Sequence, residues 1–252
     1  MSAEDVPGLH GRIPAYRDVV TRNLRSEFVL TWNQWIQRSM PVAQDNLGSE
    51  WLDTYLTSPL WRFVFSAGLV GQNVWCGVMM PSVDRTGQYY PFMLAQPLPA
   101  TTLPTALFSE AELWFQALEQ IALESLQPDG TLQQIESRLH ALPRPETRVN
   151  TAATGWEMNR PVAVNLTVSP YNPLQSYPSL LHELLRQRYP SYSLWWSMGS
   201  ERVAPAQLIS GYLPTPQCYT SLLAGDWDER GWDTPFAKNQ YEYTTAWCRP
   251  IG

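Results

Sequence analysis

The most apolar part of the chain predicts three neighbouring β-strands. Residues 61–66 (WRFVFS) alternate at first between apolar and polar side chains, residues 74–80 (VWCGVMM) are almost continuously apolar, and residues 89–95 (YYPFMLA) are largely apolar. Short apolar runs that are rich in β-branched and aromatic residues and bounded by turn residues are typical of buried strands. The connections are short, whereas parallel strands need a crossover of about a dozen residues or more, so the pattern predicts an antiparallel meander.

A helical period precedes this meander. Apolar and small side chains recur there at helical spacing, at Phe28, Trp32, Trp35, Ile36 and Ser39. We expect Ser26 to cap this helix and Pro41 to end it. A second, shorter helix over residues 51–56 is expected, with Ser49 as its cap.

Further helices are expected after the meander. Residues 97–105 (PLPATTLPT) resemble a linker, and Ser109 and Glu112 then have the spacing of a capping box that opens the next helix. Thr131 and Gln134 form a second such pair. Two later helices are expected at residues 178–189 and 215–225, each with a proline near its start.

Strands recur on both sides of a proline-rich stretch at residues 143–161, which is the best candidate for an internal boundary. A short strand near a sheet edge is expected within residues 6–13, and further strands at residues 162–168 and 193–198. The second half has too few strands to close a core of its own. We therefore predict an α/β fold in which all 252 residues form a single domain, with a mixed, largely antiparallel β-sheet sandwiched by helices.

Charge and cysteine content narrow the possible functions. The formal net charge is −6 and Lys238 is the only lysine, so a nucleic-acid partner is not expected. Three cysteines without a CxxC spacing indicate neither a disulfide framework nor a zinc site. The N-terminus is acidic and no apolar run approaches 18 residues, so we expect a cytoplasmic protein without a membrane-spanning segment.

Sequence motifs for cofactors and metals are absent. There is no Walker loop, Rossmann fingerprint or HExxH, and the acidic run at residues 226–231 lacks the glutamate that ends an EF-hand loop. We therefore expect no cofactor and no metal. The chain does hold 12 tryptophans and 12 tyrosines against 7 phenylalanines, and such side chains either fill a core or line a binding surface. An exposed set would favour a small-molecule or carbohydrate-binding protein or enzyme.

The sharpest polar cluster is the turn that carries Ser82, Asp84 and Arg85. As chemistry, it offers a serine nucleophile beside a carboxylate, or an arginine that grips phosphate. No GxSxG motif surrounds Ser82, and no motif places a histidine beside it, so serine-hydrolase chemistry is disfavoured. The remaining interpretations are a structural turn held by side-chain-to-backbone hydrogen bonds and a loop that contacts a partner.

Asp84 is predicted to be partly buried, with hydrogen bonds from an arginine or from backbone N–H groups of the turn, because a buried carboxylate needs such partners. Arg62, at the start of the first strand of the meander, lies at the same end of the sheet and is one candidate. Its other interpretation is an arginine whose apolar stem covers the sheet.

The same stretch resembles the signature of the TagF family, the accessory proteins of bacterial type VI secretion systems. The matching motifs are GxxWLxxYLTSPLWRF and GVMMPSVDRxGxYYP, strongest over residues 51–91. The resemblance extends upstream to GLHGRIPAYRDV, where the family has GxxGKLPxxGDF. Here Arg12, Arg17 and Val19 replace the family's lysine, glycine and phenylalanine, and Asp18 matches its aspartate.

The resemblance implies an α/β sandwich and a function that is not enzymatic. TagF-like proteins are post-translational repressors of type VI secretion, and are thought to bind components of the apparatus, notably the forkhead-associated (Fha) scaffold protein. On this basis we expect a cytoplasmic regulator with an Fha-type partner. Its candidate structural or partner-binding residues are Asp18, Arg62, Ser82, Asp84 and Arg85.

Overall fold

The computed structural model describes residues 6–127, 130–147, 169–172 and 174–235. Its centre is a seven-stranded sheet in the order β2-β1-β5-β4-β3-β6-β7, and every neighbouring pair is antiparallel. The strands are β1 (Gly8–Gly11), β2 (Val20–Arg22), β3 (Trp61–Phe65), β4 (Val74–Met80), β5 (Phe92–Leu98), β6 (Tyr192–Ser197) and β7 (Ala206–Gly211). The predicted meander is confirmed as β3, β4 and β5, although β5 begins three residues later than expected.

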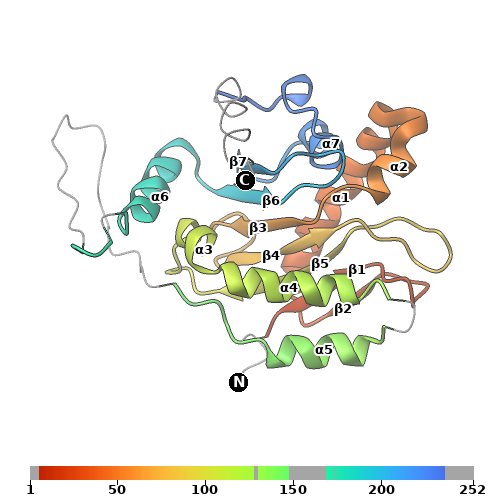
Figure 1. The fold of residues 1–252 in the computed structure, drawn as a ribbon, viewed down its shortest axis with the longest axis horizontal. Coiled ribbons are helices and arrows are strands. Elements are labelled where there is room, and N and C mark those ends of the chain that lie inside the picture. Colours follow the sequence, from red (N-terminus) through yellow and green to blue (C-terminus); the bar gives the residue numbers. More distant parts are fainter. Residues whose placement is uncertain (1–5, 128–129, 148–168, 173, 236–252) are drawn as a thin grey trace, which may run out of the picture.

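Helices cover both faces of this sheet (Figure 1). One face packs on α1 (Ser26–Leu47), α2 (Trp51–Leu56) and α7 (Pro216–Ala224). The other face packs on α3 (Pro104–Glu110), α4 (Glu112–Glu124), α5 (Leu132–Ala141) and α6 (Tyr177–Arg188). Short 3₁₀ turns occupy Gly48–Glu50 and Asp228–Arg230. The predicted sandwich of helices around an antiparallel sheet is confirmed, and strands from both sides of residues 143–161 join the one sheet of a single domain.

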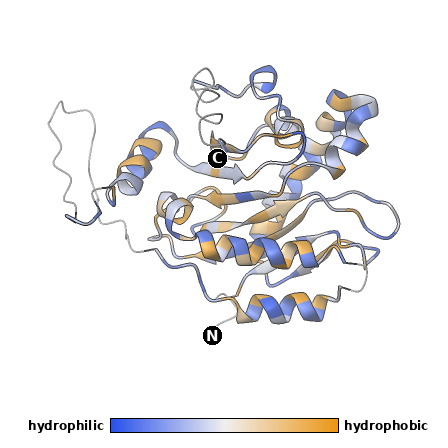
Figure 2. Ribbon diagram, in the orientation of Figure 1, coloured by the Kyte–Doolittle hydropathy of each residue, from blue (hydrophilic) through white to orange (hydrophobic). Residues whose placement is uncertain are grey.

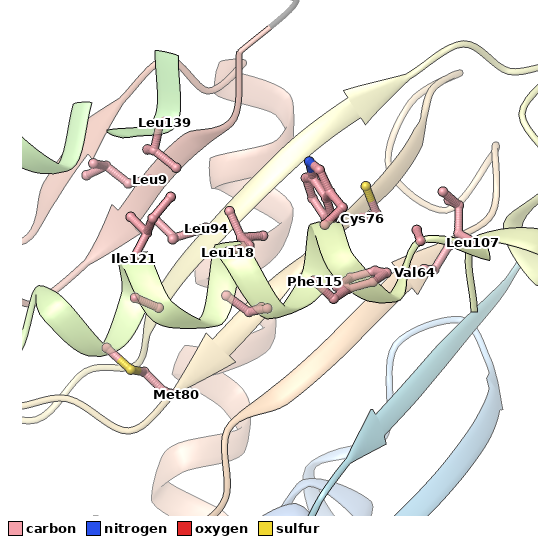
Figure 3. Close-up of a cluster of buried hydrophobic side chains, with 14 of the residues drawn as sticks. Leu9, Val64, Cys76, Met80, Leu94, Leu107, Phe115, Leu118, Ile121 and Leu139 are labelled. Carbon is pink, nitrogen blue, oxygen red and sulfur yellow. The ribbon is translucent and has the colours of Figure 1, made fainter. Parts of the chain in front are cut away.

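Each face of the sheet has its own apolar core, because successive side chains of a strand point to opposite faces. In β3, Phe63 packs with the tryptophans of α1, whereas Val64 packs with α4. Figure 3 shows Phe115, Leu118 and Ile121 of α4 pointing at the strands, with the labelled side chains of the sheet facing them. Coloured by hydropathy, the apolar residues concentrate in the strands and the facing sides of the helices (Figure 2).

Several predicted boundaries were wrong. The helix that begins at Ser26 continues through Pro41 to Leu47, and neither Ser26 nor Ser49 caps a helix with its side chain. Packing outweighs the local cost of the proline, since Ala43 beyond it is fully buried. Of the two predicted capping boxes, only the second, at Thr131, is present.

The first capping box fails because a helix already begins upstream of it. Pro104 opens α3, which places Ser109 in the last turn of that helix, where its hydroxyl donates to the carbonyl of Ala106 at 3.3 Å. The expected linker over residues 97–105 is shortened from both ends, by β5 and by α3. The predicted strand at residues 162–168 and most of the predicted boundary lie outside the described residues.

Candidate functional site

Two loops that are far apart in the sequence meet at one end of the sheet. The first connects β1 to β2 and carries Asp18, and the second connects β4 to β5 and carries Ser82, Asp84 and Arg85. β1 and β5 are antiparallel neighbours, with His10 opposite Met93. The end of β1, where the first loop begins, therefore lies beside the start of β5, where the second loop ends. We call the surface formed by residues 12–19 and 81–90 the two-loop surface; both segments belong to the motifs identified in the sequence.

Gly11 allows this close approach. It has a φ of 133°, and a Cβ atom there would lie 2.2 Å from the carbonyl oxygen of Pro91. Any larger residue would push the two loops apart, so this glycine is required by the contact between them.

The carboxylate of Asp84 is the centre of the contact. Its Oδ1 accepts hydrogen bonds from the backbone N–H of Thr86 (2.8 Å), the hydroxyl of Thr86 (2.6 Å) and the backbone N–H of Gln88 (3.0 Å). Its Oδ2 forms an ion pair with the guanidinium of Arg12, across from the other loop. The side chain has no exposed area. The predicted burial and hydrogen bonding of Asp84 are confirmed, and the arginine is Arg12.

Burial alone would raise the pKa of the Asp84 carboxyl. The hydrogen bonds from Thr86 and Gln88 and the charge of Arg12 outweigh it and lower the pKa to about 2. Asp84 is therefore ionised at neutral pH and its charge is compensated inside the molecule.

Further hydrogen bonds fix the backbone of both loops. The hydroxyl of Ser82 donates to the carbonyl of Arg12 at 2.7 Å, and the Arg85 N–H donates to the carbonyl of Tyr16 at 3.4 Å. The hydroxyl of Tyr55 in α2 donates to the Ser82 carbonyl at 2.9 Å and accepts from the Ser82 N–H at 3.1 Å. Ser82 is buried and its hydroxyl already donates to the backbone, so it serves the structure of the turn.

A buried polar network lies beneath the two loops. The Nδ1 of His10 lies 2.7 Å from the hydroxyl of Thr21 and its Nε2 lies 2.8 Å from Oδ1 of Asn33 in α1. The hydroxyl of Tyr90 donates to the same Oδ1. Because a carboxamide oxygen only accepts, Nε2 of His10 carries the proton and Nδ1 accepts from Thr21. Burial lowers the pKa of His10, which keeps the ring neutral.

The outward side chains of the two-loop surface take no part in these networks. Arg17, Asp18 and Val19 are exposed on the first loop and Arg85 is exposed on the second. Of the candidate residues, the structure thus brings Asp18, Ser82, Asp84 and Arg85 to one site. Ser82 and Asp84 form a buried lower layer, and Asp18 and Arg85 form an exposed upper layer.

Arg62 lies at the expected end of β3, opposite Val78, but it does not pair with Asp84. Its side chain is 3% exposed and points to the opposite face of β3, toward α4. There Nε and Nη2 donate to both oxygens of Glu119 at 2.7 and 2.9 Å, and Nη1 donates to Glu112 at 2.6 Å. Its guanidinium carbon also lies 5.6 Å from the centre of the Phe115 ring. This group joins α4 to the sheet, and its contacts are with Glu112, Phe115 and Glu119 and not with the two-loop surface.

Sequence reasoning missed residues that assemble the site. Arg12, Tyr16 and Tyr55 lie in the recognised motifs, but nothing in their spacing showed that all three contact the loop between β4 and β5. His182, to which no sequence motif assigns a role, is buried, with Nδ1 2.6 Å from the hydroxyl of Tyr192. Burial lowers the pKa of His182 to about 4, so a neutral ring accepts the hydrogen bond of that tyrosine.

Most tryptophans of the described ranges are core residues. Eight are buried, at Trp32, Trp35, Trp51, Trp61, Trp75, Trp114, Trp195 and Trp196. Trp227 and Trp232 are half-buried, so the described part of the chain exposes no tryptophan. For the described residues, this finding removes the tryptophan part of the basis for the carbohydrate or small-molecule alternative; of the tyrosines, Tyr171, Tyr177 and Tyr212 are exposed.

A groove of 410 Å³ runs between α4 and α5. Its walls include Ile121, Gln134 and the exposed ion pair of Glu124 with Arg138 at 2.7 Å. Over the described ranges, no group of three or more histidine, cysteine or acidic residues is arranged to hold a metal ion. A search of the same ranges finds no helix with the length and hydropathy needed to cross a bilayer.

Comparison with known proteins relates this chain to one protein family and to a solved structure. Residues 8–142 match the model of the TagF N-terminal domain, which is described as type VI secretion system-associated. The crystal structure of PA0076 from Pseudomonas aeruginosa PAO1 is similar, with 32% identity and a TM-score of 0.75 over 87% of this chain and 94% of that one. No curated protein sequence matches significantly. Both loops of the two-loop surface lie within the matched domain.

Proposed function

Since this chain belongs to the TagF family of type VI secretion system-associated proteins, we propose that it is a post-translational repressor that binds a component of the secretion apparatus. We place it in the cytoplasm and take the forkhead-associated scaffold protein of the system as its partner. We further propose that it acts by binding, without catalysis.

The two-loop surface is the single observation on which this proposal rests. Its lower layer is held rigidly, because Asp84 accepts four hydrogen bonds and Gly11 permits backbone contact between the loops. Its upper layer presents Arg17, Asp18 and Arg85 to solvent. Loops fixed by a rigid scaffold are the usual carriers of recognition, and preorganised loops lose little conformational entropy on binding.

The arrangement of the polar residues favours binding over catalysis at this site. A serine nucleophile needs a base within hydrogen-bond reach and access to a substrate. The Ser82 hydroxyl instead donates to the Arg12 carbonyl inside the turn, and Asp84 is saturated by its donors. The charged groups that remain available are the exposed ones, which suit a contact with another protein.

Deleting the gene and overproducing the protein test the proposal. We expect deletion to raise the secretion of the tube protein of the system and overproduction to lower it, without a change in transcription of the secretion genes. The amount of tube protein in the culture medium, compared with that in the cells, is the measurement. Unchanged secretion in both strains would contradict a repressor function.

A further inference from the structure

The two-loop surface exposes more positive charge than its sequence suggests. Asp84 and Arg85 are adjacent and opposite in charge, so the sequence suggests a turn without net charge. In the structure the carboxylate of Asp84 is fully buried and paired with Arg12, whereas Arg85 is exposed. The negative charge of the pair is thus compensated inside the protein, and only the positive one faces the solvent.

Arg17 extends this positive region on the neighbouring loop. The Arg85 N–H donates to the carbonyl of Tyr16, so the backbones of the two exposed arginines lie side by side. Among the described residues, neither guanidinium has a hydrogen-bond or ion-pair partner. Asp18 is the one exposed acidic residue of residues 12–19 and 81–90. The surface therefore presents two free cations against one anion, on a chain whose formal net charge is −6.

We propose that the partner binds the two-loop surface through its own carboxylate side chains, which pair with Arg17 and Arg85. The inference rests on the proposed function and adds the interface and the chemistry of the partner. A guanidinium group binds a carboxylate in a bidentate manner, with two parallel hydrogen bonds. Charges at the rim of an interface act mainly on the rate of association, through attraction at a distance.

Charge reversal tests this pairing. The probe is the purified, unphosphorylated forkhead-associated scaffold protein of the same system, and the variants are Arg17→Glu, Arg85→Glu and the double substitution. We expect the double variant to associate about tenfold more slowly at 0.1 M salt, and the difference to shrink at 1 M salt, where charges are screened. Asp18→Asn should change the rate in the opposite direction.

Arg188→Glu is the matched control. Arg188 is exposed on α6, which lies at the opposite end of the molecule from the loop between β4 and β5 (Figure 1). All these side chains are exposed, so we expect each variant to keep its Tm within about 2 °C of the wild type.

Repression in cells separates this inference from the proposed function. If the wild type represses secretion and the double variant does so as strongly, with an unchanged association rate, then the carboxylate pairing is wrong and the repressor function stands. If the wild type itself neither represses nor binds the probe, both proposals are wrong. Loss of both activities in the double variant alone, with the control unaffected, would support the pairing.

Discussion

The molecule contains two arginine–carboxylate clusters. One connects a helix to the sheet, and the other lies beneath the exposed candidate site. Arg62 lies in the interior strand β3, and each of its three guanidinium nitrogens donates to Glu119 or Glu112 of α4. Arg12 lies beyond the end of β1 and pairs with Asp84 of another loop. Both arginines bind carboxylates from distant parts of the chain, but the two clusters differ in the side chains around them.

Around Arg62, the charges serve the contact between a helix and the sheet. Around Arg12, the buried pair fixes two loops whose neighbouring arginines, Arg17 and Arg85, stay exposed and unpaired in the described structure. The difference shows that a buried ion pair does not by itself mark a functional site. The candidate site is recognised by what the pair leaves exposed.

Breaking the central cluster should have the largest effect on stability. Glu119→Ala leaves the 3% exposed Arg62 with only the half-exposed Glu112, and we expect a loss of about 2–4 kcal/mol in the free energy of unfolding. Arg62→Met should cost less, because the two glutamates that it leaves behind can both reach water. Urea unfolding at pH 7 gives both values, and a Glu119→Ala protein with wild-type stability would show that this cluster contributes nothing.

Breaking the second pair should have the next largest effect. Asp84→Ala removes the acceptor of four hydrogen bonds and leaves Arg12 without its carboxylate, so we expect Tm at pH 7 to fall by about 5 °C. Unlike the change at Glu119, it should also weaken partner binding, because it releases the two loops. Normal melting with lost binding would instead make Asp84 a direct contact of the partner.

The acid stability of the wild type gives a separate test of Asp84. Its pKa is lowered to about 2 in the folded protein from an ordinary value of 3.8, so the folded state holds fewer protons than the unfolded state between these values. The stabilisation is complete above about pH 4 and is lost as the pH falls toward 2. In Asp84→Ala this part of the pH dependence should disappear, as measured by urea unfolding between pH 5 and pH 2.

The network beneath the loops should contribute a smaller amount. Tyr90→Phe removes the hydroxyl that donates to Asn33 and keeps the edge-to-face ring contact with His10, so we expect a loss of about 1 kcal/mol. Nitrogen NMR should show the His10 proton on Nε2 in both proteins.

The lowered pKa of His10 predicts the direction in which stability changes with pH. The unfolded state binds a proton more readily, so the contribution of the neutral ring is complete above the ordinary value of 6.5 and declines as the pH falls below it. A His10 ring that titrates in the folded protein above pH 6.5 would contradict the assigned network.

The smallest effect on stability is expected at the exposed arginines. Arg85→Ala changes a side chain without a partner among the described residues, and the free energy of unfolding should stay within about 0.5 kcal/mol of the wild type. Urea unfolding of this variant beside Glu119→Ala gives the direct contrast between the two regions. If Arg85→Ala lowered the free energy of unfolding as much as Glu119→Ala, the two clusters would not differ in the way described.

The elements that the sequence predicted are those with a strong local signal. The meander was predicted because its apolar runs are bounded by turn residues, and the last helix because Thr215 and Gly225 supply its N-cap and C-cap, as the structure confirms. The edge strands β2 and β7 were missed. β2 has only three residues and β7 has few buried ones, so neither shows a clear period.

The contacts that make the candidate site depend on long-range packing. The turn at Asp84 and the need for a buried partner could be predicted from residue chemistry. Its arginine could not, because Arg12 is 72 positions away and reaches Asp84 only through the pairing of β1 with β5. Arg62 was correctly placed at this end of the sheet, opposite Val78, but its partners could not be predicted, because the docking of α4 supplies them.

Hydrogen exchange of the protein with and without the forkhead-associated scaffold protein tests most directly whether the two-loop surface is the binding site. We expect the partner to slow amide exchange at residues 15–19 and 83–88, and to leave α4 and α6 unchanged. Slower exchange confined to α6 or to the groove between α4 and α5, with both loops unaffected, would contradict this assignment.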